Sequence, residues 1–273
     1  FIVFLGITSF FLKINILNYN NFVKSIFTFY EPSHYATVLG GVLIPYLLMA
    51  EKLERWIIIT LVIALALYTP SITLLVYFFI YLVISIQKVI YFFAATALLL
   101  IISIAIHTLN PDLTSYILSR VILSPDSDNL SALIYIQGWA EAYKVIQEGY
   151  LTGLGFQMSG SNSPSDIAEK VYQISGIYKN RDGPFIASKL IVDFGLLGIL
   201  LISMYLFTLA KFYFSFFKLR GSKNQFIYGT FFAFSVEMFV RSNAYFTFGI
   251  FVLFISIFLI IELRSSNTNG TEK

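Results

Sequence analysis

The stretch RDGPFIASKLIVDFGLLG, residues 181–198, carries ionisable side chains from a polar segment directly into a long apolar one. Lys189 and Asp193 lie four residues apart and therefore share one face of a helix. Glu237 and Arg241 repeat this spacing in a second apolar segment. A charged group at membrane depth costs about 2.5–3.5 kcal/mol to insert, so such groups usually face a partner or a wet cavity. We therefore interpret the two pairs as the lining of one site.

The composition of the chain is that of a membrane protein. Of its 273 residues, 58% are hydrophobic and 12% are charged, and the mean hydropathy is +0.79. A soluble domain is less apolar, even when it has a large core. We expect an all-α protein, a polytopic bundle of transmembrane helices with one large loop outside the membrane. The net charge of +3 gives no indication of a nucleic-acid partner.

The residue types present restrict the chemistry. The chain has no cysteine, which excludes disulfides and thiolate metal sites. Its two histidines, His34 and His107, are too few for a histidine-rich metal site. We therefore expect neither a metal nor a cofactor.

The N-terminal part, residues 1–106, is predicted to contain a first group of transmembrane helices. It is apolar from its first residue, and we expect 1–12 to be the end of a truncated span. The apolar run 56–87 is twice the roughly 20 residues that one crossing needs, and Thr69-Pro70-Ser71 interrupts it. We divide this run into two spans, with one long kinked helix as the alternative. The complete spans expected here are 34–50, 53–69, 71–87 and 89–106.

Residues 107–183 contain no apolar stretch long enough to cross a membrane, and we interpret them as a large loop. Apolar residues recur at helical spacing over 129–148, which predicts an amphipathic helix. The Ser- and Asn-rich segment 158–164 is expected to be a flexible excursion. The loop is therefore predicted to be partly ordered.

The C-terminal part, residues 184–262, is predicted to contain further spans, and 263–273 a disordered polar tail. Short cytoplasmic loops retain Lys and Arg, so the basic residues indicate the orientation. With the spans divided as above, they fall on one side of the membrane, and the large loop falls on the outer side. The spans expected here are 184–210, 226–241 and 244–262; the basic residues are Lys52, Arg55, Lys88, Lys211, Lys218, Arg220, Lys223 and Arg264.

Several charged residues are then expected near the outer surface. Arg181 and Arg241 suit a phosphate or diphosphate, because a guanidinium is a forked and permanently charged donor. A carboxylate could accept a proton from a sugar hydroxyl if a setting of low polarity raises its pKa. The candidates for this base are Glu31, Asp193 and Glu237, with His34 as a further one, although a His at a helix start more often serves as a cap.

The same residues have structural interpretations. Each charged pair could be an intrahelical ion pair whose Lys or Arg reaches toward the membrane surface. Trp139 and Tyr143 could stack on sugar rings or anchor the loop helix at the membrane surface. Gly153-Leu154-Gly155 matches half of a phosphate-binding loop, but no Gly-Lys-Ser follows it.

Four pieces of sequence resemble the Wzy-type O-antigen polymerases of Gram-negative bacteria. They are EPSHYA at 31–36, YIQGW at 135–139, GLGFQ at 153–157 and the stretch 181–198. Their order, and the large loop between groups of spans, are also similar to this family. Many relatives have an Arg shortly before the Trp of the loop helix, where this chain has Gln137; Arg120 and Lys144 are the other cations available there.

The resemblance implies a metal-independent glycosyltransferase of the bacterial inner membrane. Such an enzyme joins oligosaccharide repeats linked to undecaprenyl diphosphate on the periplasmic face. The implied partners are this lipid-linked glycan, membrane lipids and a chain-length regulator protein. A close alternative is an O-antigen ligase, which transfers glycan to lipid A–core, and an alternative of a different class is a transporter or flippase. Carried onto this chain, diphosphate binding falls to Arg181 and Arg241. We name Lys189, Gln137 and Trp139 as further candidates for substrate binding.

Overall fold

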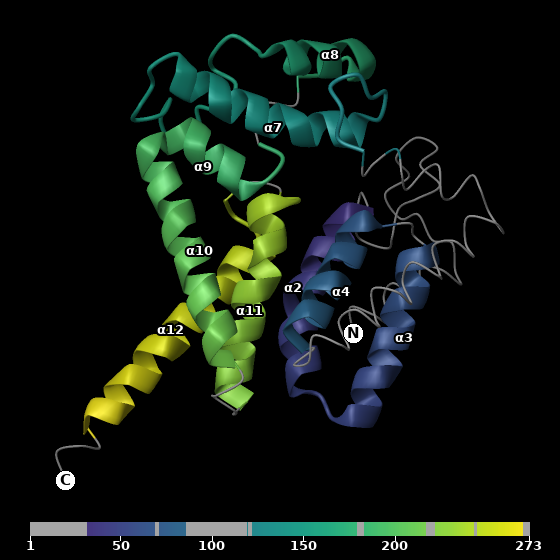
Figure 1. Ribbon diagram of the computed structural model, residues 1–273, viewed down its shortest axis with the longest axis vertical. Helices are drawn as coiled ribbons and strands as arrows, with labels where there is room; N and C mark the ends of the chain where they lie inside the picture. Colours follow the sequence, from purple (N-terminus) through teal and green to yellow (C-terminus); the bar gives the residue numbers. More distant parts are fainter. Residues whose placement is uncertain are drawn as a thin grey trace. The chain divides into compact units, whose positions relative to one another are not determined.

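The computed structural model describes residues 32–68, 71–85, 119, 122–178, 183–216, 222–242 and 245–269. All regular secondary structure in these ranges is helical, so the prediction of an all-α fold is confirmed for them (Figure 1). The expected spans 1–12 and 89–106 lie outside the described residues.

The chain divides into two compact units, each assembled from segments that are distant in the sequence. The first consists of Phe1–Ser85, Phe212–Val236 and Phe248–Lys273, and the second of Ile86–Lys211 and Glu237–Thr247. Both charged pairs of the predicted site fall in the second unit. Most of that unit is the predicted loop and the helices that follow it.

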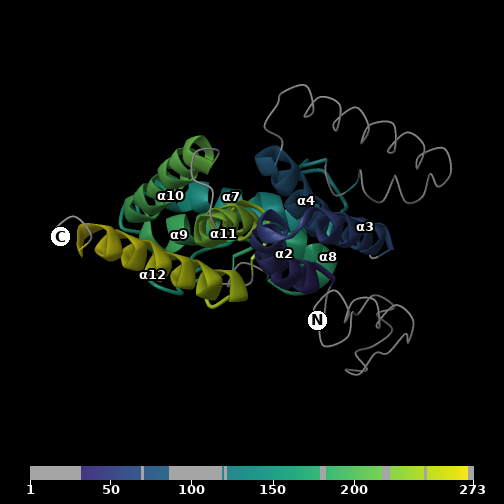
Figure 2. The same ribbon diagram turned by 90° about the horizontal axis from the view of Figure 1, so that it is seen from below.

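In the first unit, helix α2 (Pro32–Met49) packs against helix α4 (Ile72–Ser85), which also contacts helix α3 (Lys52–Tyr68) (Figures 1 and 2). The division of the apolar run 56–87 into two helices is confirmed, because α3 ends and α4 begins on either side of Thr69-Pro70-Ser71. A proline cannot continue the helical hydrogen bonding of the residues before it. By contrast, α2 runs through its own proline, Pro45, without ending.

Two further helices of the first unit lie near the C-terminus, α11 (Ser222–Phe239) and α12 (Phe248–Asn269), and α12 packs against α2. An exposed ion pair of 3.3 Å joins Lys223 to Glu262. The prediction of a disordered tail from residue 263 is wrong up to Asn269, where α12 ends. Neither proline nor glycine occurs in the tail before Gly270, so nothing in the sequence stops the helix earlier.

In the second unit, helix α7 (Leu130–Gln147) lies between helix α8 (Asp166–Ser175) and helix α9 (Ile186–Phe194) (Figure 1). Helix α7 matches the amphipathic helix expected over 129–148. Its side-chain cap is Asn129, whose oxygen accepts from the backbone N–H groups of Ser131 and Ala132.

Helix α10 (Leu196–Phe216) follows α9 after a single residue, Gly195. Its segment Leu196–Ser215 has a mean hydropathy of 1.8, and 11% of its most apolar 18-residue window is buried. Within the described ranges this is the one helix long and apolar enough to cross a membrane. Shorter apolar helical segments are Ser33–Met49, Ile72–Ser85 and Phe248–Leu263.

Candidate functional site

The sharp joint between α9 and α10 positions the site. Gly195 has φ +58° and ψ −126°, a conformation that a residue with a side chain rarely adopts. A Cβ at this position would lie 2.1 Å from the Leu151 carbonyl oxygen, so glycine is required by space as well. The Leu196 N–H donates to this same oxygen at 2.8 Å. The prediction of one continuous span over 184–210 is therefore wrong, because the chain turns at Gly195.

The segment Gly153-Leu154-Gly155, which matches half of a phosphate-binding loop, forms backbone hydrogen bonds with the C-terminal end of α9. The Leu154 N–H donates to the Val192 carbonyl at 2.8 Å, and the Gly155 N–H to the Asp193 carbonyl at 3.0 Å. Both carbonyls lie in the last turn of α9, where backbone carbonyls have no hydrogen-bond partner within the helix itself. A Cβ at Gly153 would lie 2.4 Å from the Asp193 carbonyl carbon. The pattern therefore has a structural role here.

The Asp193 carboxylate is completely buried and accepts three hydrogen bonds. They come from the Gln157 N–H at 3.1 Å, the Ser159 hydroxyl at 2.8 Å and the Tyr245 hydroxyl at 2.9 Å. Two of the donors belong to the loop after α7, and the third follows α11. This carboxylate therefore joins three segments of the second unit.

Lys189 is the cation that accompanies this buried carboxylate. Its Nζ lies 3.9 Å from Asp193 Oδ2, and the side chain is 3% exposed. The expectation that the two residues share a helix face is confirmed. The ammonium also lies 5.2 Å from the centre of the Tyr245 ring, within the range of a cation–π contact. Burial, and then the nearby Asp193 charge, raise the pKa of Tyr245, so the phenol stays protonated and donates to Asp193.

The segment that carries Glu237 and Arg241 is hydrogen-bonded to the residues just before α9. Ser242 donates its N–H to the Pro184 carbonyl at 2.9 Å, just before α9 begins. Arg241 precedes this contact, and Tyr245 follows it. Helix α11 ends at Phe239, so the expectation that Glu237 and Arg241 share a face of one helix is wrong. Glu237 is buried and accepts a hydrogen bond from the Thr247 hydroxyl.

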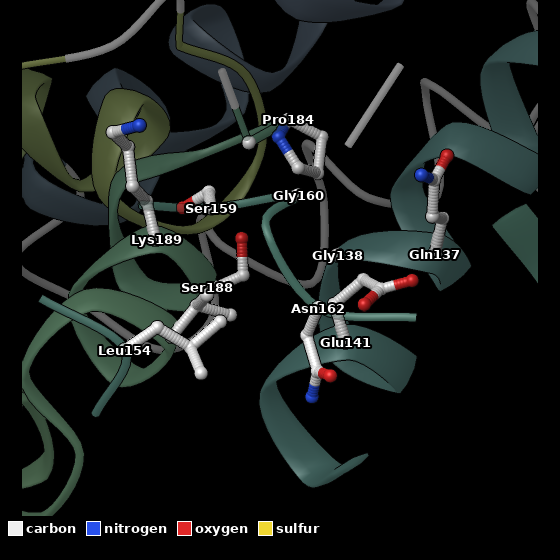
Figure 3. A pocket seen from close by; sticks show the side chains of 12 residues that line it. Gln137, Gly138, Glu141, Leu154, Ser159, Gly160, Asn162, Pro184, Ser188 and Lys189 are labelled. Carbon is white, nitrogen blue, oxygen red and sulfur yellow. The ribbon is translucent and has the colours of Figure 1, made fainter. Parts of the chain in front are cut away.

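A pocket lies between α7, α9 and the loop that joins α7 to α8 (Figure 3). Its enclosed volume is about 20 Å³, and the empty space is about 380 Å³ when the part open to solvent is counted. The polar side chains come from all three elements, with Lys189 and Ser188 on α9 and Gln137 and Glu141 on α7 (Figure 3). The full lining is Gln137, Gly138, Glu141, Leu154, Ser159, Gly160, Asn162, Gly183, Pro184, Ser188, Lys189 and Val192.

Gln137 differs from the other polar residues of this lining. Its side chain is 2% exposed, and neither its amide nitrogen nor its amide oxygen has a hydrogen-bond partner in the part of the chain that the structure describes. Buried amides are nearly always paired, because an unpaired one loses its bonds to water and gains none. Its place in a pocket lining makes it a candidate for contact with a ligand.

The Ser- and Asn-rich loop is fixed over this pocket at several points. Lys144 donates to the carbonyl and the hydroxyl of Ser163, and to the Pro164 carbonyl, each at 3.0 Å. The Ser165 N–H donates to Glu141 Oε1 at 2.9 Å. The sequence predicts a flexible excursion here, and in the structure the end of this segment contacts side chains of α7. Local composition does not report such long-range partners.

The other predicted site residues lie in several places. The centres of the Trp139 and Phe185 rings lie 4.9 Å apart, and Trp139 is 38% exposed. Part of the Trp139 surface therefore packs α7 against the start of α9. His34 belongs to the first unit, where the Thr37 hydroxyl donates to its carbonyl at 2.8 Å. Glu31 and Arg181 lie outside the described residues.

Sequence reasoning missed Ser159, Tyr245 and Glu141. Ser159 and Tyr245 lie 34 and 52 residues from the carboxylate that they bind, so no local spacing connects them to it. Glu141 follows Gln137 by one helical turn, and this spacing on the predicted helix was the available signal. Across the described ranges, no three His, Asp or Glu side chains come together that could hold a metal ion.

Neither a protein-family model, a curated protein nor a solved structure matches the chain.

Proposed function

We propose that the protein is an O-antigen polymerase, a metal-independent glycosyltransferase that joins oligosaccharide repeats carried on undecaprenyl diphosphate. One observation carries this proposal. The buried Lys189 ammonium lines a pocket on α9, and α9 leads through Gly195 directly into the membrane-length helix α10. A cation beside a polar pocket at the end of such a helix suits a diphosphate whose lipid tail remains in the membrane.

The proposal includes a polytopic arrangement in the bacterial inner membrane. Helix α10 would cross it, and the shorter apolar helices of the first unit would form further crossings. The distribution of basic residues favours a periplasmic position for the loop that contains α7 and α8. The site would then open near the outer leaflet, where lipid-linked repeats are joined.

The proposed chemistry is attack by a sugar hydroxyl of the acceptor on the anomeric carbon of the donor glycan. The bond from that carbon to the diphosphate breaks, and negative charge develops on the departing diphosphate. Lys189, with Arg241 and Arg181, would stabilise this charge. Glu141 is the carboxylate in the pocket lining, and with Asp193 and Glu237 of the same unit it is a candidate for accepting the hydroxyl proton. Because three donors already occupy Asp193, we assign it the role of holding Lys189.

Complementation tests the proposal. The complete protein is expressed in a strain that lacks its own polymerase and makes the cognate repeat, and the lipopolysaccharide is separated by size. The unsubstituted protein should restore a ladder of repeats. Lys189→Met and Arg241→Ala should leave single-repeat lipopolysaccharide, because the leaving diphosphate loses a cation.

The matched control is Lys170→Met on α8, whose ammonium contacts the Pro125 carbonyl at 2.7 Å. It removes the same charge away from the pocket and should leave the ladder intact. Membrane abundance of each variant is measured by immunoblotting, so that loss of protein is recognised. A normal ladder from both pocket variants would refute the role of these cations, and failure of the unsubstituted protein would refute the polymerase.

The main alternative is an O-antigen ligase, which uses the same lipid-linked donor and differs in its acceptor. Expression in a strain that lacks its ligase and keeps its polymerase separates the two. Transfer of glycan to lipid A–core in that strain would favour the ligase. A transporter or flippase would restore neither product in these two strains.

A further inference from the structure

The further inference concerns the buried amide of Gln137 and rests on the proposed function. Both polar atoms of this amide lack a partner among the described residues, although the side chain is 2% exposed. An apolar residue of similar volume, such as Leu, would avoid this cost. A residue that weakens the fold is commonly kept because it contacts a ligand. The amide would therefore gain its hydrogen bonds when the pocket is filled.

The surroundings of Gln137 indicate what kind of group would fill it. Apolar atoms of Leu154, Val192 and Pro184 also line the pocket. Its wall is close-packed at Gly138, where a Cβ would lie 2.4 Å from Pro184 Cγ. The enclosed part of the pocket is about 20 Å³. This volume excludes an entire sugar ring and leaves room for a substituent of a few atoms at most.

We infer that Gln137 recognises an acylamino group, such as an acetamido group, on a sugar of the lipid-linked glycan. A Gln amide presents one acceptor and one donor side by side, and an acylamino group presents the complementary donor and acceptor. The small methyl group of an acetamido substituent would contact the apolar part of the lining. A free amine would add a positive charge to a pocket that already holds the Lys189 ammonium. A hydroxyl lacks the paired geometry.

Saturation-transfer NMR on the complete protein in lipid nanodiscs tests this inference. The probes are N-acetylglucosamine, glucosamine and glucose at equal concentrations. The unsubstituted protein should bind N-acetylglucosamine about tenfold more tightly than the other two, the scale expected when a buried polar group finds its partner. Gln137→Leu should lose this preference. Equal binding of the three sugars, or absence of binding to the unsubstituted protein, would overturn the inference.

Thermal unfolding of the ligand-free protein provides a second readout. Gln137→Leu replaces an unpaired buried amide with an apolar group and should leave the unfolding midpoint unchanged or raise it. The control is Gln147→Leu, at an exposed position of the same helix, which should keep the sugar preference. A lowered midpoint in Gln137→Leu would show that the amide supports the fold, and would overturn the inference.

The result is separable from that of the complementation experiment. If the protein prefers N-acetylglucosamine through Gln137 but restores no ladder, the sugar site is supported and the polymerase function is refuted. If the protein restores a ladder but lacks this preference, the polymerase function is supported and the role inferred for Gln137 is refuted.

Discussion

At the scale of single residues, Asp193 shows how one buried carboxylate can organise a site. It accepts hydrogen bonds from the Gln157 backbone and from two hydroxyl groups, and it lies beside the Lys189 ammonium. Charges are expensive to bury, and these partners compensate for the loss of water. The carboxylate therefore holds the cation in place and fastens the surrounding segments.

Replacing Asp193 should damage the fold more than replacing its cation. In Asp193→Asn, the side chain loses the negative charge that lies 3.9 Å from the Lys189 ammonium, and its NH2 group faces hydrogen-bond donors instead of accepting from them. Loss of one partner of a buried ion pair costs about 3–5 kcal/mol. Lys189→Met should cost less, because Asp193 keeps three hydrogen-bond donors. The measurement is the free energy of unfolding in detergent, from urea titrations followed by tryptophan fluorescence.

The same comparison distinguishes a structural from a catalytic Asp193. If this residue acted mainly as a base, Asp193→Asn would keep a nearly normal free energy of unfolding while abolishing ladder formation. That outcome would contradict the role assigned here.

The residue-scale prediction from sequence was partly successful for a physical reason. The spacing of Lys189 and Asp193 is a local helical property, and the ion pair follows from it. Tyr245 and Ser159 meet the carboxylate only through the folding of distant segments. A single sequence carries no periodic signal for such contacts.

At the scale of elements, the joint between α9 and α10 fixes the direction in which each helix runs. Gly195 lies against the Leu151 carbonyl, which also accepts from the first N–H of α10. The loop after α7 is thereby locked to the helix junction. The ion pair lies on α9, so its position depends on this joint.

Substitution of Gly195 should therefore be much more damaging than substitution of another glycine with positive φ. Gly195→Ala puts a methyl group 2.1 Å from the Leu151 oxygen, and the backbone has to move. Gly149→Ala is the matched control, since its φ is +85° and nothing lies within 4 Å of the added Cβ. The control should cost about 1 kcal/mol, and Gly195→Ala several times more, in the free energy of unfolding. Equal losses would show that φ strain alone matters at the joint.

Element boundaries were predictable only where the sequence contains a strong interruption. The break between α3 and α4 has a proline in a polar triplet, and the prediction was confirmed there. The break at Gly195 lies between Phe and Leu and has neither a proline nor a polar triplet to mark it. A glycine is compatible with a continuous helix, so the sequence alone gave no reason to divide the run.

At the scale of the whole molecule, the proposal places the loop that contains α7 and α8 in the periplasm. The described part of the chain has one helix of membrane length, and the polytopic arrangement is a proposal based on composition and charge. The chain has no cysteine, so single cysteines can be introduced without background labelling.

Topology is tested with a membrane-impermeant thiol reagent on intact cells whose outer membrane has been permeabilised. Tyr143→Cys, at a position of α7 that is 69% exposed, should be labelled from the periplasm. Leu53→Cys, at the exposed start of α3, should be labelled only after the inner membrane is disrupted. Labelling in the reverse order would place the loop in the cytoplasm and contradict both the proposed orientation and the proposed periplasmic reaction.

The segment above the pocket has a consequence for selection among substrates. Residues 159–165 of this segment form hydrogen bonds with Asp193 on α9 and with Lys144 and Glu141 on α7. The segment forms the rim of the pocket, and this rim is therefore attached to both helices. If the proposed function is correct, an opening with a rim of this kind would have a set width and would sort arriving glycans by girth and branching before any individual sugar is recognised. Bulky side branches on a repeat would then be rejected at the entrance, whatever their chemical identity.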